Sequence, residues 1–315
     1  MIPVPIAKAM PARSHADVAM PTISRPRRLC CVTARAVLGT VFAAALFAGI
    51  VLVPSSSSGP NAAPRPAPMA AEDAARVDVL LVLAVDVSYS MDMDELAIQR
   101  EGYAQALVSP DFMRALKDGA NGRIAAAYFD WAAAEDQRLV VPWRIIDGPE
   151  SAGAVANEIA NAPLRRASRT SISGAMYYGR KLFAEAPYKG LRKVIDISGD
   201  GPNNNGQLVT IARDELVNEG ITINGLPIVA KYNSTFGMDI ANLDIYYEDC
   251  MIGGAGAFVV PIRERDKFKE AIRTKLVMEV AGRMPQMRVV PVAAERTPRI
   301  SCTIGEKLWQ ERWGR

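Results

Sequence analysis

The most informative stretch of the chain is Val79-Leu80-Leu81-Val82-Leu83-Ala84-Val85-Asp86-Val87-Ser88-Tyr89-Ser90. Its first seven residues are apolar, which predicts a strand buried on both faces of a sheet. A carboxylate and two hydroxyls follow at Asp86, Ser88 and Ser90, and the acidic run 92–95 after them suits a helix N-terminus. Because open α/β sheets bind ligands at the carboxyl ends of their strands, these side chains predict a site there. Their oxygens suit Mg²⁺ or Mn²⁺.

The rest of the chain alternates strand and helix patterns. Further strands are expected at 123–131, 138–146, 193–198, 221–229 and 257–262. Helices are expected from the acidic run to residue 108, at 150–160, from Thr170 to 186, at 207–218 and at 264–281, with a short terminal helix near Trp309 and Trp313. This order predicts the α/β class, a doubly wound, mostly parallel sheet flanked by helices in a single domain.

Four segments differ in composition: a leader at 1–53, a Pro/Ala/Ser-rich linker at 54–76, the α/β domain at 77–282 and a C-terminal tail at 283–315. The leader holds an uncharged apolar run at 36–53 that follows several arginines. This pattern indicates either a signal peptide or a single membrane anchor, and both place the domain outside the cytoplasm. We expect it in the periplasm, on the extracytoplasmic face of the inner membrane, or secreted.

The charge distribution argues against a nucleic-acid partner. The formal net charge is +3, but residues 1–70 carry seven of the 37 Lys and Arg and only one of the 34 Asp and Glu. The remaining chain is therefore slightly acidic and lacks the basic character that nucleic-acid binding requires.

The body of the chain has two cysteines, Cys250 and Cys302. In an oxidising compartment they form a natural disulfide pair that ties the tail to a late loop. The alternative to a disulfide is that the two cysteines are unpaired, buried thiols.

Two further segments carry oxygen ligands that should meet the first motif. Thr170, just before a predicted helix, offers a third hydroxyl, and Asp200 follows a predicted strand in the run Ser198-Gly199-Asp200-Gly201-Pro202. Two carboxylates and three hydroxyls fit an octahedral ion that keeps some of its waters. Candidate rim residues are Asp130, Asn203 and Asn204, although Asp130 suits a turn equally well and the two amides can simply shape their loop.

The set Asp86-x-Ser88-x-Ser90, Thr170 and Asp200-Gly201 resembles the metal-ion-dependent adhesion site of von Willebrand factor type A domains. A closer resemblance, over runs such as Gln99-Arg100-Glu101-Gly102-Tyr103 and Ile221 to Ile228, is to the bacterial domain-of-unknown-function family 1194. The resemblance implies that Ser88 and Ser90 bind the metal directly, that Thr170 binds directly or through water, and that Asp86 and Asp200 act mostly through water. One departure is Gly199, where the adhesion motif usually has threonine.

Histidine-dependent catalysis is excluded in the body of the chain, because the only histidine is His15 in the leader. Hydroxyl ligands leave a bound ion electrophilic, so it seeks a carboxylate from a partner. We therefore predict that the chain is not an enzyme but an exported, metal-dependent module that binds an Asp or Glu side chain of a protein ligand through Mg²⁺ or Mn²⁺. The alternatives are a metal-dependent hydrolase of phosphate or ester substrates and a scaffold with a vestigial site.

Overall fold

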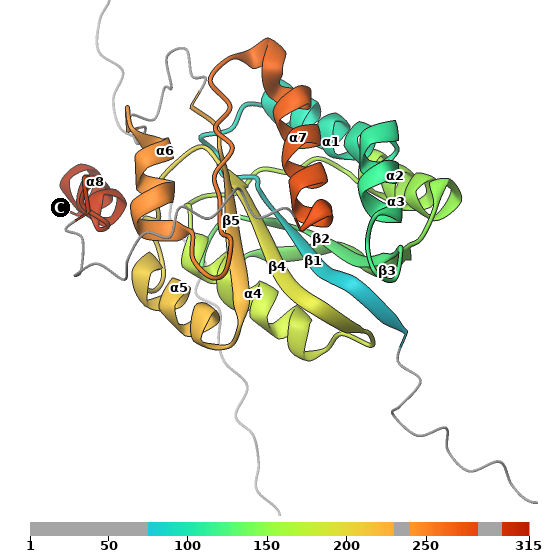
Figure 1. Cartoon of the computed structure of the whole chain (residues 1–315). Coiled ribbons are helices and arrows are strands. Elements are labelled where there is room, and N and C mark those ends of the chain that lie inside the picture. The colour runs from blue at the N-terminus through green and yellow to red at the C-terminus, as the bar shows by residue number, and fades with distance from the viewer. Residues whose placement is uncertain (1–74, 230–239, 283–297, 315) are drawn as a thin grey trace, which may run out of the picture. The chain divides into compact units, whose positions relative to one another are not determined.

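The computed structural model describes residues 75–229, 240–282 and 298–314 (Figure 1). The predicted leader with its apolar run at 36–53, and most of the predicted linker, lie outside these residues. Within the described part of the chain, no helix combines the length and the apolar character needed to cross a membrane.

A five-stranded sheet forms the centre of the fold, in the order β3-β2-β1-β4-β5. Only β3 runs antiparallel to its neighbour, so the predicted mostly parallel sheet is confirmed. The central strand β1 has ten buried residues out of eleven, as its apolar sequence predicts. The strand bounds are β1 Arg76–Asp86, β2 Ile124–Trp131, β3 Gln137–Ile146, β4 Lys189–Gly199 and β5 Ile221–Pro227.

Helices cover both faces of this sheet, which makes the fold doubly wound (Figure 1). One apolar core lies beneath α1, α2, α3 and α7, and a second lies beneath α4 and α5 on the opposite face. The helix bounds are α1 Met93–Leu107, α2 Pro110–Lys117, α3 Pro149–Asn161, α4 Ile172–Ala184, α5 Val209–Asn218, α6 Leu243–Tyr246, α7 Phe268–Ala281 and α8 Ile304–Trp313.

One prediction about local structure is wrong, and one helix was not predicted. Residues 257–262 do not form the last strand, because they meet β5 only through isolated bridges at Val259 and Ile262. Val260 and Ile262 donate their N–H groups to the carbonyls of Gly225 and Pro227, but Pro227 has no N–H to donate in return, and Phe258 donates its N–H to the side chain of Asn224. A continuous ladder therefore does not form. The helix α2 was not predicted from the sequence; Ser109 caps its start by accepting the Phe112 N–H.

The C-terminal tail is attached to the domain by a disulfide. Cys250 lies in a π-helical turn, Tyr247–Met251, directly after α6, and it is bonded to Cys302 with their Cα atoms 5.4 Å apart. The predicted pair is therefore confirmed. The predicted short terminal helix is α8, which begins two residues after Cys302.

Candidate metal centre

The first motif lies where β1 ends and α1 begins. Asp86 is fully buried, and its Oδ1 accepts the backbone N–H of Ser88 (2.7 Å), which fixes the turn after the strand. The turn places the hydroxyls of Ser88 and Ser90 side by side, 2.7 Å apart. Asp92 then caps α1 in a reciprocal capping box with Glu95, as the acidic run predicts.

The second segment is the loop 162–171 between α3 and α4, which brings Thr170 to the same place. The Ala167 N–H donates to the Val87 carbonyl (2.9 Å), so the loop runs alongside the first motif. Thr170 is buried and lines the same pocket as Ser88 and Ser90.

The third segment follows β4 and carries Asp200. Its Oδ1 accepts the Ser90 hydroxyl at 2.6 Å, so a continuous line of oxygens runs from Ser88 through Ser90 to Asp200. Asp200 is buried. The five predicted ligands thus come from three loops at the carboxyl edge of the sheet.

The chemistry of these oxygens fits a small, hard cation. Mg²⁺ takes six oxygens at about 2.0–2.1 Å, so neighbouring ligands lie about 2.9 Å apart. The hydroxyl oxygens of Ser88 and Ser90, 2.7 Å apart, are near enough to bind one such ion together, and Asp200 accepts the Ser90 hydroxyl at 2.6 Å from outside that pair. Among the described residues no group of three or more His, Cys, Asp and Glu could hold a metal. The candidate centre consists mainly of hydroxyls.

The two candidate rim amides shape the third loop. Asn204 exchanges two hydrogen bonds with Thr170, one through its side-chain oxygen (2.9 Å) and one through its backbone N–H (2.8 Å). Asn203 accepts the Ser173 N–H (3.0 Å) and donates to Glu306 of α8 (2.8 Å). These side chains therefore join the second and third loops and the terminal helix.

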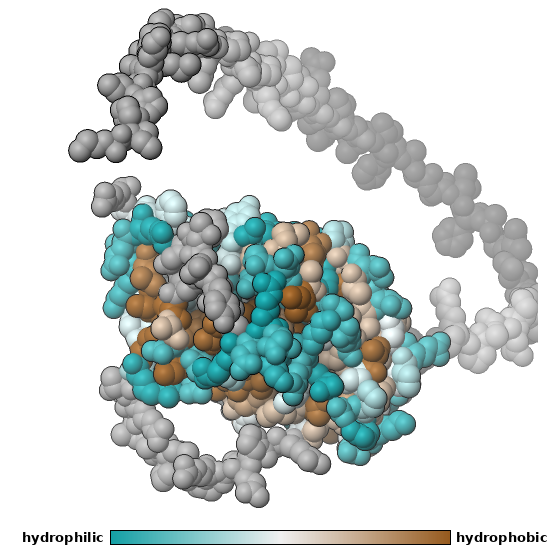
Figure 2. Space-filling model, turned by 90° about the horizontal axis from the view of Figure 1, so that it is seen from above, coloured by the Kyte–Doolittle hydropathy of each residue, from teal (hydrophilic) through white to brown (hydrophobic). Residues whose placement is uncertain are grey.

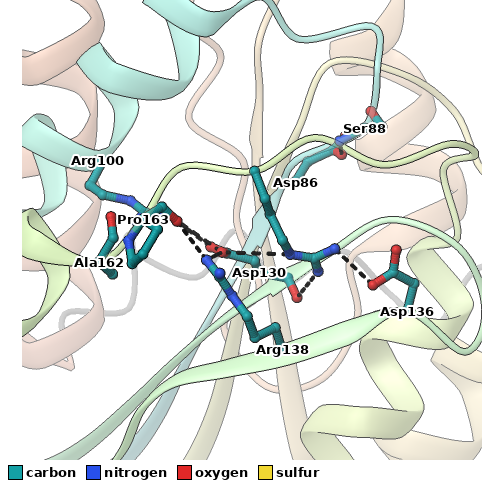
Figure 3. A network of polar contacts seen from close by, with 9 residues as sticks. Asp86, Ser88, Arg100, Asp130, Asp136, Arg138, Ala162 and Pro163 are labelled. Atoms are coloured by element: carbon teal, nitrogen blue, oxygen red, sulfur yellow. Dashed lines mark hydrogen bonds and ion pairs between the residues drawn. The ribbon is translucent and has the colours of Figure 1, made fainter.

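Asp130, the third candidate rim residue, lies at the end of β2 inside a cluster of arginines (Figure 3). Its fully buried carboxylate pairs with Arg100 (3.1 Å) and Arg138 (2.6 Å), and Arg165 lies 3.9 Å away. Arg100 and Arg138 also donate to the carbonyls of residues 162 and 163, at the start of the loop that carries Thr170. Asp130 thus anchors that loop, and its carboxylate is paired with arginine side chains.

Tyr247 is a further residue of this site that was not predicted from the sequence. The residue is fully buried, and its hydroxyl lies beside the backbone of Gly199 at the end of β4. Burial, followed by the charges of Asp86 and Asp200, raises the pKa of Tyr247 well above its ordinary value, so the phenol stays protonated. Only the unusual glycine at 199 signalled that another side chain fills this space.

The comparisons with known proteins agree with this fold. A family model described as "Protein of unknown function (DUF1194)" matches residues 76–284, which is more than half of the chain. No curated protein matches the sequence.

Solved structures resemble the chain at low sequence identity. The pilus adhesin SpaC from Lactobacillus rhamnosus GG is 10% identical with a TM-score of 0.50, over 65% of this chain and 31% of the adhesin. A von Willebrand factor type A protein from Catenulispora acidiphila is 15% identical with a TM-score of 0.45, over 65% of this chain and 43% of that one. Proximal thread matrix protein 1 from the mussel byssus, with a zinc-occupied metal-ion-dependent adhesion site, is 12% identical with a TM-score of 0.41, over 64% of this chain and 46% of the matrix protein. The chain therefore matches less than half the length of each, and the likeness concerns the fold.

Proposed function

This chain belongs to the DUF1194 family of proteins of unknown function, and we propose that it is an exported, metal-dependent module that captures an acidic side chain of another protein. The observation that carries the proposal is the line of oxygens from Ser88 through Ser90 to Asp200, with Thr170 in the same pocket. The von Willebrand factor type A fold supports the general class of a protein-binding module.

Ser88, Ser90 and Thr170 would hold Mg²⁺ or Mn²⁺, while Asp86 and Asp200 would act through water or by orienting the hydroxyls. Asp86 already fixes the turn of the first motif, and Asp200 accepts the Ser90 hydroxyl. When bound, the ion supplies an electrophilic position for a carboxylate oxygen, because neutral hydroxyls cancel little of its charge. An Asp or Glu of the partner is the matching group.

A hydrolytic function has less support. The pocket beside the hydroxyls is lined mainly by serine, threonine, asparagine, arginine and aromatic side chains. None of the described residues that line it is a histidine, a lysine or a cysteine. Water activation would then depend on Asp86 or Asp200, and both carboxylates already have structural hydrogen bonds.

The test is to remove one hydroxyl and follow both metal and partner binding. We expect Ser90→Ala to weaken Mn²⁺ binding at least about tenfold in calorimetry, because a ligand and the link to Asp200 disappear together. Wild-type protein should capture a partner from an envelope extract in Mg²⁺ or Mn²⁺ and release it in EDTA.

Ala120→Ser is the control, because it makes the reverse exchange at an exposed residue in the segment between α2 and β2, at the edge of the sheet where β2 begins. It should bind metal and partner as the wild type does. Partner capture that persists unchanged in EDTA would contradict the proposal.

A further inference from the structure

A pocket of about 120 Å³ opens directly beside the oxygen cluster. Its lining combines Ser88, Ser90 and Thr170 of the cluster with a wall formed by Trp309 and Trp313 of α8. The two indole rings lie 5.9 Å apart, centroid to centroid, and tilt by 30°, so they lie side by side on the helix. The candidate metal centre therefore borders an apolar space on one side.

The terminal helix that supplies this wall is fixed to the third loop of the site. Gly305 packs against the backbone of Asn203 so closely that a Cβ there would lie 2.0 Å from the Asn203 carbonyl oxygen. Asn203 also donates to Glu306, and the disulfide holds the segment just before the helix. The wall lies beyond residues 76–284, the part that the family model matches.

The rim of the pocket is positively charged. The Arg169 guanidinium lies 3.4 Å from the centre of the Trp309 ring, and its backbone has a φ of 75°, a strained value for a residue other than glycine. Arg166 donates to the Tyr89 carbonyl and lies 5.4 Å from the centre of the Tyr89 ring. Both arginines flank the hydroxyls, so an acidic ligand is attracted to this side of the site.

From this arrangement we propose that the pocket is a second subsite of the metal centre, which binds an aromatic or large aliphatic side chain adjacent to the captured acidic residue of a protein partner. A cavity of about 150 Å³ holds one benzene ring, so a space of this size and lining suits a single apolar side chain. The inference rests on the proposed function and adds a sequence preference to it. Figure 2, which views the molecule from above Figure 1, shows hydrophilic and hydrophobic residues interspersed on that face.

The test compares three capped peptides, acetyl-Gly-Asp-Gly-amide, acetyl-Gly-Asp-Phe-amide and acetyl-Phe-Asp-Gly-amide, on the full chain with Mn²⁺. We expect at least one phenylalanine peptide to bind about tenfold more tightly than the glycine peptide, because it buries a ring in the pocket. Trp309→Ala should make the affinities for the phenylalanine peptide and the glycine peptide equal. Trp309→Phe should keep most of the preference for the phenylalanine peptide. Leu191→Ala is the matched control, since Leu191 is 68% exposed and lies near the start of β4, at the far edge of the sheet.

The outcomes separate this inference from the proposed function. Metal-dependent binding of all three peptides with equal affinity overturns the subsite and leaves the proposed function standing. Binding of the phenylalanine peptides that is unchanged in EDTA overturns the link between pocket and metal. If no peptide binds while a partner is still captured in a metal-dependent way, the subsite fails alone, and if neither binds, both proposals fail.

Discussion

At the residue scale, Gly199 shows how the site accommodates a departure from the adhesion motif. A Cβ at this position would lie 2.9 Å from both the Tyr247 hydroxyl oxygen and Asp86 Oδ2, which is closer than real Cβ contacts. Tyr247 therefore occupies the space that a larger side chain at 199 would need. Its phenol, kept protonated by burial and by the charges of Asp86 and Asp200, sits beside the carboxylate that fixes the first motif.

We predict that Gly199→Ala lowers the free energy of unfolding by about 1–3 kcal/mol, because the added methyl overpacks a filled space. Tyr247→Phe removes the hydroxyl, so the double variant should lose less than the sum of the single variants. Urea unfolding of all four proteins measures this coupling. Gly153→Ala in α3, where a Cβ meets nothing within 4 Å, should be neutral or slightly stabilising, and strict additivity at 199 and 247 would refute the steric account.

At the element scale, α7 and two strands share a fully buried charge cluster. The Lys275 ammonium lies 2.7 Å from Asp196 of β4 and 2.6 Å from Glu279 of its own helix. Asn224 of β5 donates to the second oxygen of Glu279 (2.7 Å). One cation thus faces two buried acids, and burial raises the pKa of both Asp196 and Glu279 although Lys275 opposes the shift.

This cluster predicts a pH dependence of stability with a definite sign. An acid with a raised pKa binds more protons when folded than when unfolded, so the free energy of unfolding falls as the pH rises from about 4 towards the folded pKa. Glu279→Gln removes one acid and leaves Lys275 to balance Asp196 alone. We therefore expect the free energy of unfolding, measured in urea, to fall less in the variant than in the wild type as the pH rises from about 4.5 to about 7.5.

Glu158→Gln serves as the control for that experiment, because Glu158 is in an exposed ion pair with Arg144 at 3.1 Å. Its stability should follow the wild-type pH dependence, since exposed pairs contribute little. Identical pH slopes for Glu279→Gln and the wild type would show that the cluster does not titrate in this range.

The sequence predicts an element well when the apolar pattern of that segment alone is enough to define it. The strand β1 is a continuous apolar run, and Asp200 reaches its end because the parallel strands β1 and β4 end at one edge. Thr170 reaches the same edge because it precedes α4, the helix that leads back to the start of β4. The segment 257–262 also has apolar residues, but whether it forms a ladder depends on Asn224 and Pro227, residues of another strand. Likewise, no local pattern reveals that Asp130 meets three arginines, since these come from α1, β3 and a loop.

At the scale of the whole molecule, a disulfide ties the terminal helix that borders the site to the domain. The tail is also held by the exposed ion pairs from Arg299 to Glu248 and Asp249, which contribute little, and by the partly buried side chains of Ile300 and Ile304 on the core beneath α4 and α5. The bond closes a separation of 52 residues, for which loop-closure entropy contributes about 4 kcal/mol. A disulfide is also typical of an oxidising compartment, which supports the proposed export.

We therefore predict that Cys250→Ser/Cys302→Ser releases α8 while the sheet domain stays folded. The core beneath α1 and α7 contains no residue of α8, and the core beneath α4 and α5 meets that helix through one partly buried side chain, Ile304, so the cooperative unfolding of the sheet should be retained. Trypsin should cleave after Lys307 at least about tenfold faster than in the wild type, because the helix undocks more often once the loop is open. Adding reductant to the variant should change nothing further.

In the same variant, Mn²⁺ binding should persist while the preference for phenylalanine peptides disappears, since the oxygen cluster belongs to the domain and the indole wall to the tail. Unchanged cleavage and unchanged preference would mean that the noncovalent contacts alone hold the helix against the site.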